Sequence, residues 1–185
     1  MVVRMAINAL CVVAHPDDCV IFARPFIDHY SDWNWTILYL TYSPEEPRSI
    51  EMYSYWETRN ILTLHLGYVD TYLDMENNQI SFDEEQAARE LKNVAGRYDL
   101  ILTHNPDGDY GHIHHKFVSS CVSLSNKPVV YFANWQQQNL ELRSNEDLIL
   151  DSFPLHKDVI EGFQDRNLGR YLVTESAKGL INGQT

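Results

Sequence analysis

Strand-like apolar runs alternate with helical segments along most of this 185-residue chain. The runs that predict strands are Ala6–Val13, Trp35–Thr41, Asp99–Thr103 and Val129–Ala133, with weaker candidates at Val69–Leu73 and Asp147–Leu150. Helical patterns cover Val20–His29, Ser49–Leu66, the segment from the Ser81/Glu84 capping box to about Ala95, His112 to Leu124, and His156–Phe163. Alternating strands and helices predict an α/β fold, a Rossmann-like three-layer α/β/α sandwich around a mostly parallel sheet.

The length of the chain favours one domain, which we expect to span residues 1–185 with a frayed tail from about Lys178. A hydrophobic content of 44% is enough for a buried core. The 26 acidic and 14 basic residues leave a net charge of −12, which argues against binding to nucleic acid or to an anionic membrane surface. The three cysteines form no Cys-x-x-Cys pair, so a reducing, cytoplasmic location is expected.

A first polar cluster, His15-Pro-Asp17-Asp18, follows the first predicted strand directly. An imidazole beside two carboxylates at a strand end is unfavourable unless a cation or hydrogen-bond donors compensate the charges. One interpretation is a solvated turn in which Asp17 or Asp18 caps the next helix. The other is that His15 and one aspartate bind a divalent metal ion while the second aspartate acts as a base.

A second polar cluster follows the strand Asp99–Thr103, where four of the eight histidines fall between positions 104 and 115. His112 and His115 lie three residues apart and project from one face of a helix, whereas His114 is expected to point elsewhere. Ligands of parallel sheets bind beyond the carboxyl ends of the strands, where both clusters lie. Two imidazoles and one carboxylate are the usual ligands of a catalytic zinc ion, and they also match the pattern of non-haem iron sites.

These two clusters resemble the motifs of the LmbE/PIG-L family of zinc-dependent N-deacetylases. Ala14-His-Pro-Asp-Asp18 is similar to the first motif of that family, Ala-His-Pro-Asp-Asp-Glu. The segment Gly108–His115 is similar to the second motif, Gly-His-Pro-Asp-His. The resemblance implies an LmbE-like fold and a metal ion, Zn²⁺ or alternatively Fe²⁺, bound by His15, Asp18 and His115.

The resemblance also implies the catalytic residues and the reaction. Asp17 is the expected general base that activates water. His112 would stabilise the tetrahedral intermediate or protonate the leaving amine, and Tyr110 would polarise the scissile carbonyl. The implied reaction is hydrolysis of an N-acetyl group from a small amide, most often an N-acetylglucosamine-type sugar or conjugate.

The sequence departs from the family pattern at several positions. Cys19 replaces the glutamate that ends the first motif, and a nucleophilic role for its thiol would need a paired base. His114 replaces the aspartate that orients the histidine two residues earlier, so Asp107 or Asp109 would have to substitute for it. In the predicted helix Ser49–Leu66, the family's usual Arg-x-x-Glu spacing before Leu-Gly is not reproduced.

Two other functions stay open at this point. The chain could hydrolyse a different small amide, on a nucleotide-linked or thiol-linked substrate, or it could be a metal-containing binding module without catalysis. The presence of Asp17 beside the expected ligands favours catalysis. The expected partner is a small acetylated molecule, with no nucleic acid and no membrane, and self-association into a homo-oligomer is left open.

Overall fold

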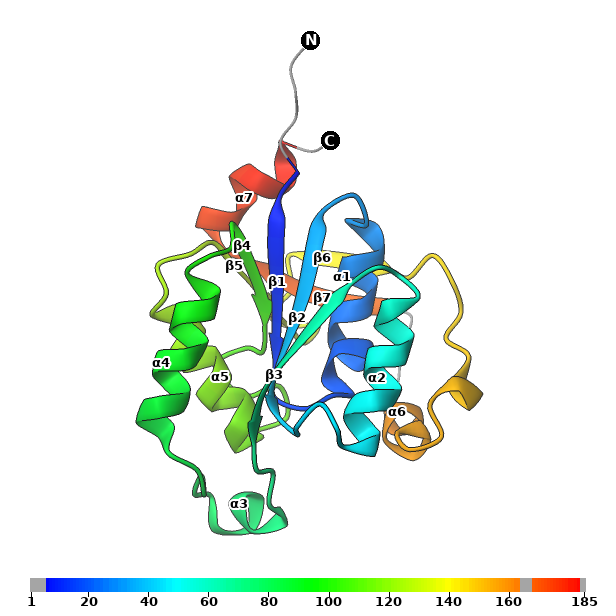
Figure 1. The fold of residues 1–185 in the computed structure, drawn as a ribbon. Helices are drawn as coiled ribbons and strands as arrows, with labels where there is room; N and C mark the ends of the chain where they lie inside the picture. The colour runs from blue at the N-terminus through cyan, green and yellow to red at the C-terminus, as the bar shows by residue number, and fades with distance from the viewer. Residues whose placement is uncertain (1–5, 164–167, 184–185) are drawn as a thin grey trace.

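A computed structural model describes residues 6–163 and 168–183 and contains one seven-stranded sheet in the order β3-β2-β1-β4-β5-β7-β6 (Figure 1). The strands are β1 (Asn8–Val13), β2 (Asn34–Thr41), β3 (Leu62–Tyr68), β4 (Leu100–Thr103), β5 (Val129–Phe132), β6 (Leu140–Arg143) and β7 (Leu168–Val173). The first five strands pair in parallel, and only β7 runs antiparallel to its neighbours β5 and β6. The predicted mostly parallel α/β sheet is therefore confirmed.

Helices cover both faces of the sheet and complete the three layers (Figure 1). The helices of one face are α4 (Glu84–Ala95) and α5 (Ile113–Ser123), and those of the other are the π-helix η1 (Cys19–Ala23), α1 (Arg24–His29), α2 (Pro47–Glu57), α6 (Lys157–Gly162) and α7 (Glu175–Asn182). Short elements complete the description, namely α3 (Tyr72–Asn77) and the 3₁₀ turn η2 (Leu150–Ser152). Central strand β1 is buried on both faces, with Cys11 in one core cluster and Val12 in the other.

Several sequence-based assignments were wrong. The predicted helix Ser49–Leu66 ends at Glu57, and its second half is the edge strand β3, whose alternation Leu-Thr-Leu-His-Leu has the period of a strand. The predicted strand Val69–Leu73 is a loop that leads into α3. Asp83, rather than Ser81, caps α4 by accepting a hydrogen bond from the backbone of Gln86.

The carboxyl-terminal part of the chain also differs from expectation. Residues 147–149 form no strand, and η2 follows them. Strands β6 and β7 were missed, because short strands at or near a sheet edge are defined mainly by their pairing partners. The tail expected to fray from about Lys178 is helical as far as Asn182, and residues 184–185 lie outside the described residues.

The order of the strands determines where a ligand binds. From β1 the chain moves to β2 on one side, whereas β4 lies on the other side of β1, so the loops that leave β1 and β4 diverge between these two strands. In sheets of this kind, ligands bind in the crevice beyond the carboxyl ends at such a switch point. Both polar clusters lie there. In Figure 1, α3 lies at this same lower end and α7 at the opposite end.

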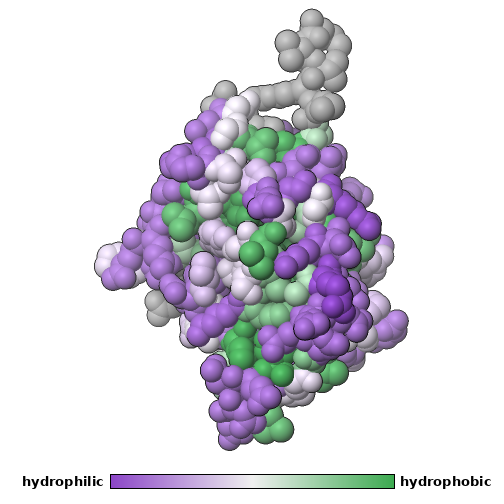
Figure 2. Space-filling model, turned by 90° about the vertical axis from the view of Figure 1, so that its left-hand side faces the viewer, coloured by the Kyte–Doolittle hydropathy of each residue, from purple (hydrophilic) through white to green (hydrophobic). Residues whose placement is uncertain are grey.

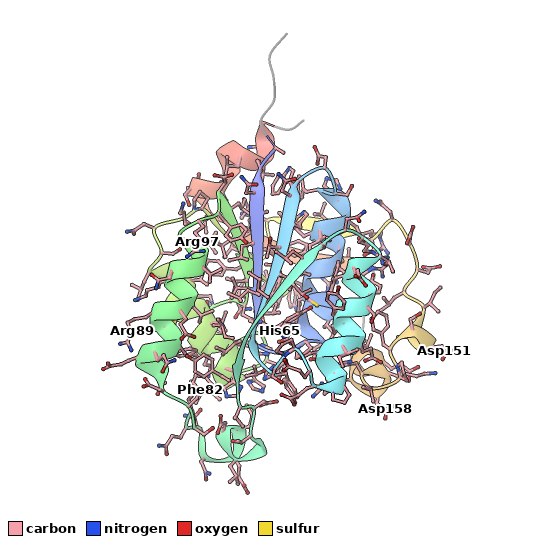
Figure 3. All side chains as sticks on the ribbon, in the orientation of Figure 1. His65, Phe82, Arg89, Arg97, Asp151 and Asp158 are labelled. Carbon is pink, nitrogen blue, oxygen red and sulfur yellow. The ribbon has the colours of Figure 1, made fainter. Side chains whose placement is uncertain are left out.

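Helix α4 is amphipathic, with Ala87, Leu91 and Ala95 buried against the sheet. The basic side chain of Arg89 extends from this helix away from the sheet (Figure 3), and Arg97, in the turn after the helix, is exposed as well. Figure 2 accordingly shows the face over α4 and α5 as largely hydrophilic, with separate apolar patches. Within the described ranges, no helix is both long and apolar enough to cross a membrane.

Candidate metal centre and active site

The loop after β1 turns sharply at His15-Pro-Asp17-Asp18 and leads directly into η1. The backbone N–H of His15 donates to Asp18 Oδ2 over 2.8 Å, which places the imidazole and the carboxylate of this turn side by side. The side chains of His15, Asp17 and Asp18 are all buried. Burial of two adjacent carboxylates excludes the solvated-turn interpretation and requires compensating charge nearby.

The loop after β4 has a tightly fixed backbone. Gly108 has a φ of +73°, and a Cβ atom there would lie 2.6 Å from the backbone oxygen of His112, so only glycine fits. Asp109 also has a left-handed φ, 62°, and exchanges hydrogen bonds with Asn105. This conformation holds the Asp109 carboxylate between two imidazoles, 2.5 Å from Nδ1 of His104 and 2.8 Å from Nδ1 of His115.

The three predicted metal ligands converge in this structure. His15 Nδ1 lies 3.2 Å from Asp18 Oδ2, and His115 Nε2 lies 3.3 Å from each of those atoms. Three ligands of a tetrahedral zinc ion, each about 2.0 to 2.2 Å from the metal, are separated by about 3.3 to 3.6 Å. The spacing and chemistry of His15, Asp18 and His115 therefore fit a divalent metal ion with room for a further ligand.

Proton positions reinforce this fit. Because the ionised Asp109 can only accept, His115 donates through Nδ1–H, which leaves its Nε2, facing Asp18, to bind either a proton or a metal ion. Burial would raise the pKa of Asp18, but His115 and His104 outweigh it and lower that pKa well below its usual value. Burial also opposes protonation of His15, yet the nearby carboxylates of Asp18 and Asp70 raise its pKa to about 9. The cluster therefore attracts a cation, either a proton or a metal ion.

The predicted base, Asp17, lies beside this cluster without joining the three converging atoms. Burial and the neighbouring Asp18 raise the pKa of Asp17, and the guanidinium of Arg48, 3.2 Å from its Oδ2, partly offsets this. The two adjacent aspartates thus differ in basicity. Asp18 is held ionised, whereas Asp17 takes up a proton more readily, as a general base must.

His112 and Tyr110 line the same small cavity of about 150 Å³, together with Asp17 and Arg48. His112 caps α5, and its Nδ1 accepts a hydrogen bond from the backbone N–H of His114, so its proton is on Nε2. Burial, together with His15 and His115, lowers the pKa of His112 to about 3. His112 is therefore a neutral hydrogen-bond donor. Tyr110 is 56% exposed at the rim of the cavity.

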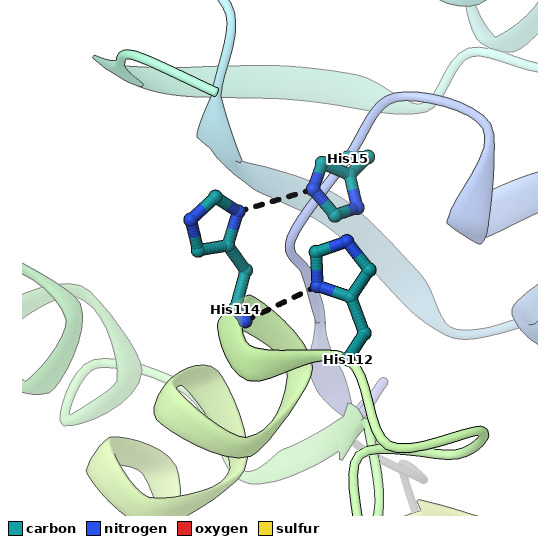
Figure 4. Close-up of side chains that lie close together, drawn as sticks. All are labelled: His15, His112 and His114. Carbon is teal, nitrogen blue, oxygen red and sulfur yellow. Dashed lines mark hydrogen bonds between the residues drawn. The ribbon is translucent and has the colours of Figure 1, made fainter. Parts of the chain in front are cut away.

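Two departures from the family pattern have a clear structural outcome. His114 does not point away, as expected, but is fully buried with Nδ1 3.2 Å from His15 Nε2 (Figure 4). Cys19 donates to the carbonyl of Pro16 and accepts from Trp56 Nε1–H, and burial raises its pKa to about 12. The Cys19 thiol is therefore neutral and structural, which removes the basis for a nucleophilic role.

Sequence reasoning missed the role of His104 and the pairing of the residues around the site. His104 accepts the backbone N–H of Ala14 at Nε2 and donates to Asp109, so it connects the two loops. Asp109 orients His115 rather than His112, and Asp107 instead accepts a surface hydrogen bond from Gln137. The density of histidines between positions 104 and 115 indicated a cluster of polar residues here, but it did not indicate which carboxylate contacts which imidazole.

Arg48 and Glu51 have the Arg-x-x-Glu spacing, although the next Leu-Gly pair along the chain is only at Leu66-Gly67. This spacing was overlooked because the helix was expected to start at Ser49, whereas α2 starts at Pro47. His156 joins the two residues by accepting from Arg48 Nε–H at 2.9 Å and contacting the Glu51 carboxylate. This chain of contacts holds Arg48 against Asp17.

Comparison with known sequences identifies the family. Residues 10–124 match the PIG-L family, described as GlcNAc-PI de-N-acetylase. The chain belongs to this family. Its two motif loops, with His15 to Asp18 in one and His112 to His115 in the other, lie inside the matched region. A relative from Acanthamoeba polyphaga mimivirus, the uncharacterised protein L374, is 29% identical over 138 residues, which are 67% of this chain and 60% of the relative.

Solved structures of similar fold agree with this family. The N,N'-diacetylchitobiose deacetylase from Pyrococcus horikoshii superposes with a TM-score of 0.63 at 14% identity, over 94% of this chain and 86% of that one. A deacetylase of teicoplanin biosynthesis gives 0.57 at 9% identity, over 91% and 99%. A 4-carboxy-2-hydroxymuconate hydratase from Pseudomonas putida KT2440 gives 0.54 at 14% identity, over 88% and 76%. At these identities the likeness establishes the LmbE-like fold alone.

Proposed function

We propose that this chain is a metal-dependent N-deacetylase. The observation that carries the proposal is the convergence of His15 Nδ1, Asp18 Oδ2 and His115 Nε2 within 3.3 Å of one another. Asp17, which is more basic than Asp18, lines one cavity with His15 and Asp18. The three converging residues would hold a divalent metal ion, which would supply the Lewis acidity that polarises a carbonyl group and lowers the pKa of water. Membership in the PIG-L family supports the same reaction class.

The side chains around the metal ligands divide the remaining chemistry. Asp17 takes a proton from the water molecule that attacks the amide carbonyl carbon. As the carbonyl oxygen becomes negatively charged, it accepts a hydrogen bond from the Nε2–H of His112 and a second one from the hydroxyl of Tyr110. Because the low pKa of His112 disfavours it as an acid, Asp17 returns its proton to the leaving nitrogen. The products are acetate and a free amine.

The proposed substrate is an N-acetylated amino sugar or a conjugate of one. A cavity of about 150 Å³ suits a small acyl group, with the rest of the substrate extending past Tyr110 into solvent. The family description and the diacetylchitobiose deacetylase both concern acetamido sugars. Zinc is the proposed metal, and ferrous iron is the alternative for the same two imidazoles and carboxylate.

Amine release tests the proposal. Protein reconstituted with one equivalent of Zn²⁺ is incubated with N-acetylglucosamine and with N,N'-diacetylchitobiose, and free amine is measured with fluorescamine. We expect amine and acetate in equal amounts, which metal removal abolishes and either Zn²⁺ or Fe²⁺ restores. Bound metal without amine release from either compound would contradict the proposed substrate class. No bound metal under any of these conditions would contradict the site itself.

A second candidate is hydrolysis of a small amide that carries an anionic group. The guanidinium of Arg48 lines the cavity and is partly exposed, with 31% of its side chain accessible, so it could contact a phosphate as well as Asp17. Faster amine release from a phosphorylated acetamido sugar than from its neutral counterpart would favour this candidate.

The contact between Arg48 and Asp17 predicts a pH dependence. Because Arg48 lowers the pKa of Asp17 against burial and Asp18, Arg48→Met should raise that pKa further. Asp17 must be ionised to act as a base, so the acid limb of the kcat/KM profile should move to higher pH, with a larger loss at pH 6 than at pH 8. Arg48→Lys keeps the charge and should move the limb less. An equal loss at every pH would show that Arg48 acts on the substrate instead.

A further inference from the structure

The imidazole of His15 has a second nitrogen that the proposed metal site does not use. Its Nδ1 faces Asp18 and His115, whereas its Nε2 lies 3.2 Å from Nδ1 of His114 (Figure 4). His114 is fully buried, and its ring lies beside that of Phe82, with the ring centroids 5.5 Å apart. The nearest polar group to this face of His15 is therefore another imidazole.

The other nitrogen of His114 contacts a carboxylate. His114 Nε2 lies 2.8 Å from Asp74 Oδ2, and Asp74 is 2% exposed. Asp74 is itself held by the hydroxyl of Thr71 and by the hydroxyl and backbone N–H of Ser81. Helix α3 and the residues that flank it thus place one fixed, acceptor-only carboxylate behind His114.

The hydrogen bonds from His15 through His114 to Asp74 can run in only one donor direction when Asp74 is ionised. An ionised Asp74 accepts, so His114 donates through Nε2–H and its Nδ1 carries a lone pair. That lone pair accepts from His15 Nε2–H, which leaves the lone pair of His15 on Nδ1, aimed at the metal site. We propose that Asp74 and His114 are positioning residues that fix the tautomer and orientation of His15 for metal binding. This inference rests on the metal site proposed above.

The same device appears on the opposite side of the site. Asp109 accepts from Nδ1–H of His115 and thereby aims Nε2 of that residue at Asp18. Each histidine ligand is thus oriented from behind by a buried carboxylate, directly for His115 and through His114 for His15. Such outer partners typically change metal affinity by about 10-fold to 100-fold when they are removed.

A second cation is the competing interpretation of this region. Asp70 Oδ1 lies 3.7 Å from His15 Nε2 and 3.6 Å from His114 Nδ1, so these three atoms could surround an ion. The hydrogen-bonding distances favour the row of His15, His114 and Asp74 as a relay of hydrogen bonds. With one metal ion on Nδ1 of His15, a second ion on Nε2 would require the imidazole to lose both of its protons. The number of metal ions bound distinguishes the two.

The test uses zinc affinity, measured by competition with a chromogenic chelator, on the full chain. We expect one equivalent of Zn²⁺ in the wild type and about 10-fold to 100-fold weaker binding in His114→Leu. His114→Asn keeps an acceptor toward His15 and should recover part of that loss. Asp74→Asn, which removes the charge but little volume, should also weaken binding. Glu76→Gln, an exposed change on the same helix, is the matched control and should bind zinc like the wild type.

A spectroscopic readout separates positioning from general damage to the fold. Long-range ¹H–¹⁵N correlation spectra of the zinc-loaded wild type should show the His15 proton on Nε2, and this signal should shift or disappear in His114→Leu. Equal zinc affinity in the wild type and in His114→Leu would overturn the relay while the metal site stands. Two equivalents in the wild type, reduced to one in His114→Leu, would overturn it in favour of a second metal ion. A wild type that binds no zinc would contradict the metal site itself.

Discussion

Replacement of Asp17 by asparagine is expected to lower kcat/KM for amine release by about 10²-fold to 10⁴-fold, the range for loss of a general base. The amide has nearly the same shape and can still accept from Arg48, but it cannot take a proton from water. Asp17 supplies none of the three atoms that converge on the proposed metal position, so the zinc content of the variant should remain one equivalent. Fluorescamine kinetics and elemental analysis of the same protein sample measure both quantities.

Asp107→Asn is the matched control for this variant. Asp107 is an exposed carboxylate in the loop after β4, and its only described contact, from Gln137 Nε2, can be kept by an asparagine oxygen. Its activity and zinc content should equal those of the wild type. If Asp17→Asn lost its metal, Asp17 would be a ligand rather than the base. If it retained full activity, another group would have to accept the proton.

The convergence of the proposed metal ligands could be predicted from sequence because each lies in a short motif that follows a strand. Pairing of β1 with β4 then brings the two loops together, and that adjacency follows from an ordinary parallel α/β arrangement. The hydrogen bonds within the loops were harder to predict. Which carboxylate supports which imidazole depends on backbone dihedrals, such as the left-handed φ of Asp109, that residue spacing does not reveal.

His114 lies in a helix that was predicted, but its direction was not. The carboxylates near His15 and His114 could not be predicted, because they come from a region that was assigned wrongly. Both carboxylates lie after β3: Asp70 is inside the segment Val69–Leu73, which was expected to be a strand, and Asp74 follows that segment directly. With β3 assigned as helix, the sheet lacks the edge strand that delivers these carboxylates to the site. The late helix start expected at Ser49 also hid the spacing of Arg48 and Glu51, because Arg48 belongs to the first turn of α2. Edge strands and short helices depend on tertiary contacts that local pattern does not contain.

Replacement of His115 by alanine is expected to weaken zinc binding by more than about 100-fold, beyond the effect of losing an outer partner. The variant removes one of three ligands and leaves Asp18 facing a single imidazole of the set. At a zinc concentration about 100 times Kd, the metal should stabilise the wild type against unfolding by about 2.7 kcal/mol and so raise its melting temperature. The same zinc concentration should change the melting temperature of His115→Ala very little. Asp109→Asn keeps His115 as a ligand but loses the charge that orients it. The zinc affinity of this variant should therefore lie between those of the wild type and His115→Ala. Tight binding of one zinc ion by His115→Ala would mean that a different set of residues holds the metal, because two ligands, His15 and Asp18, are too few for tight zinc binding.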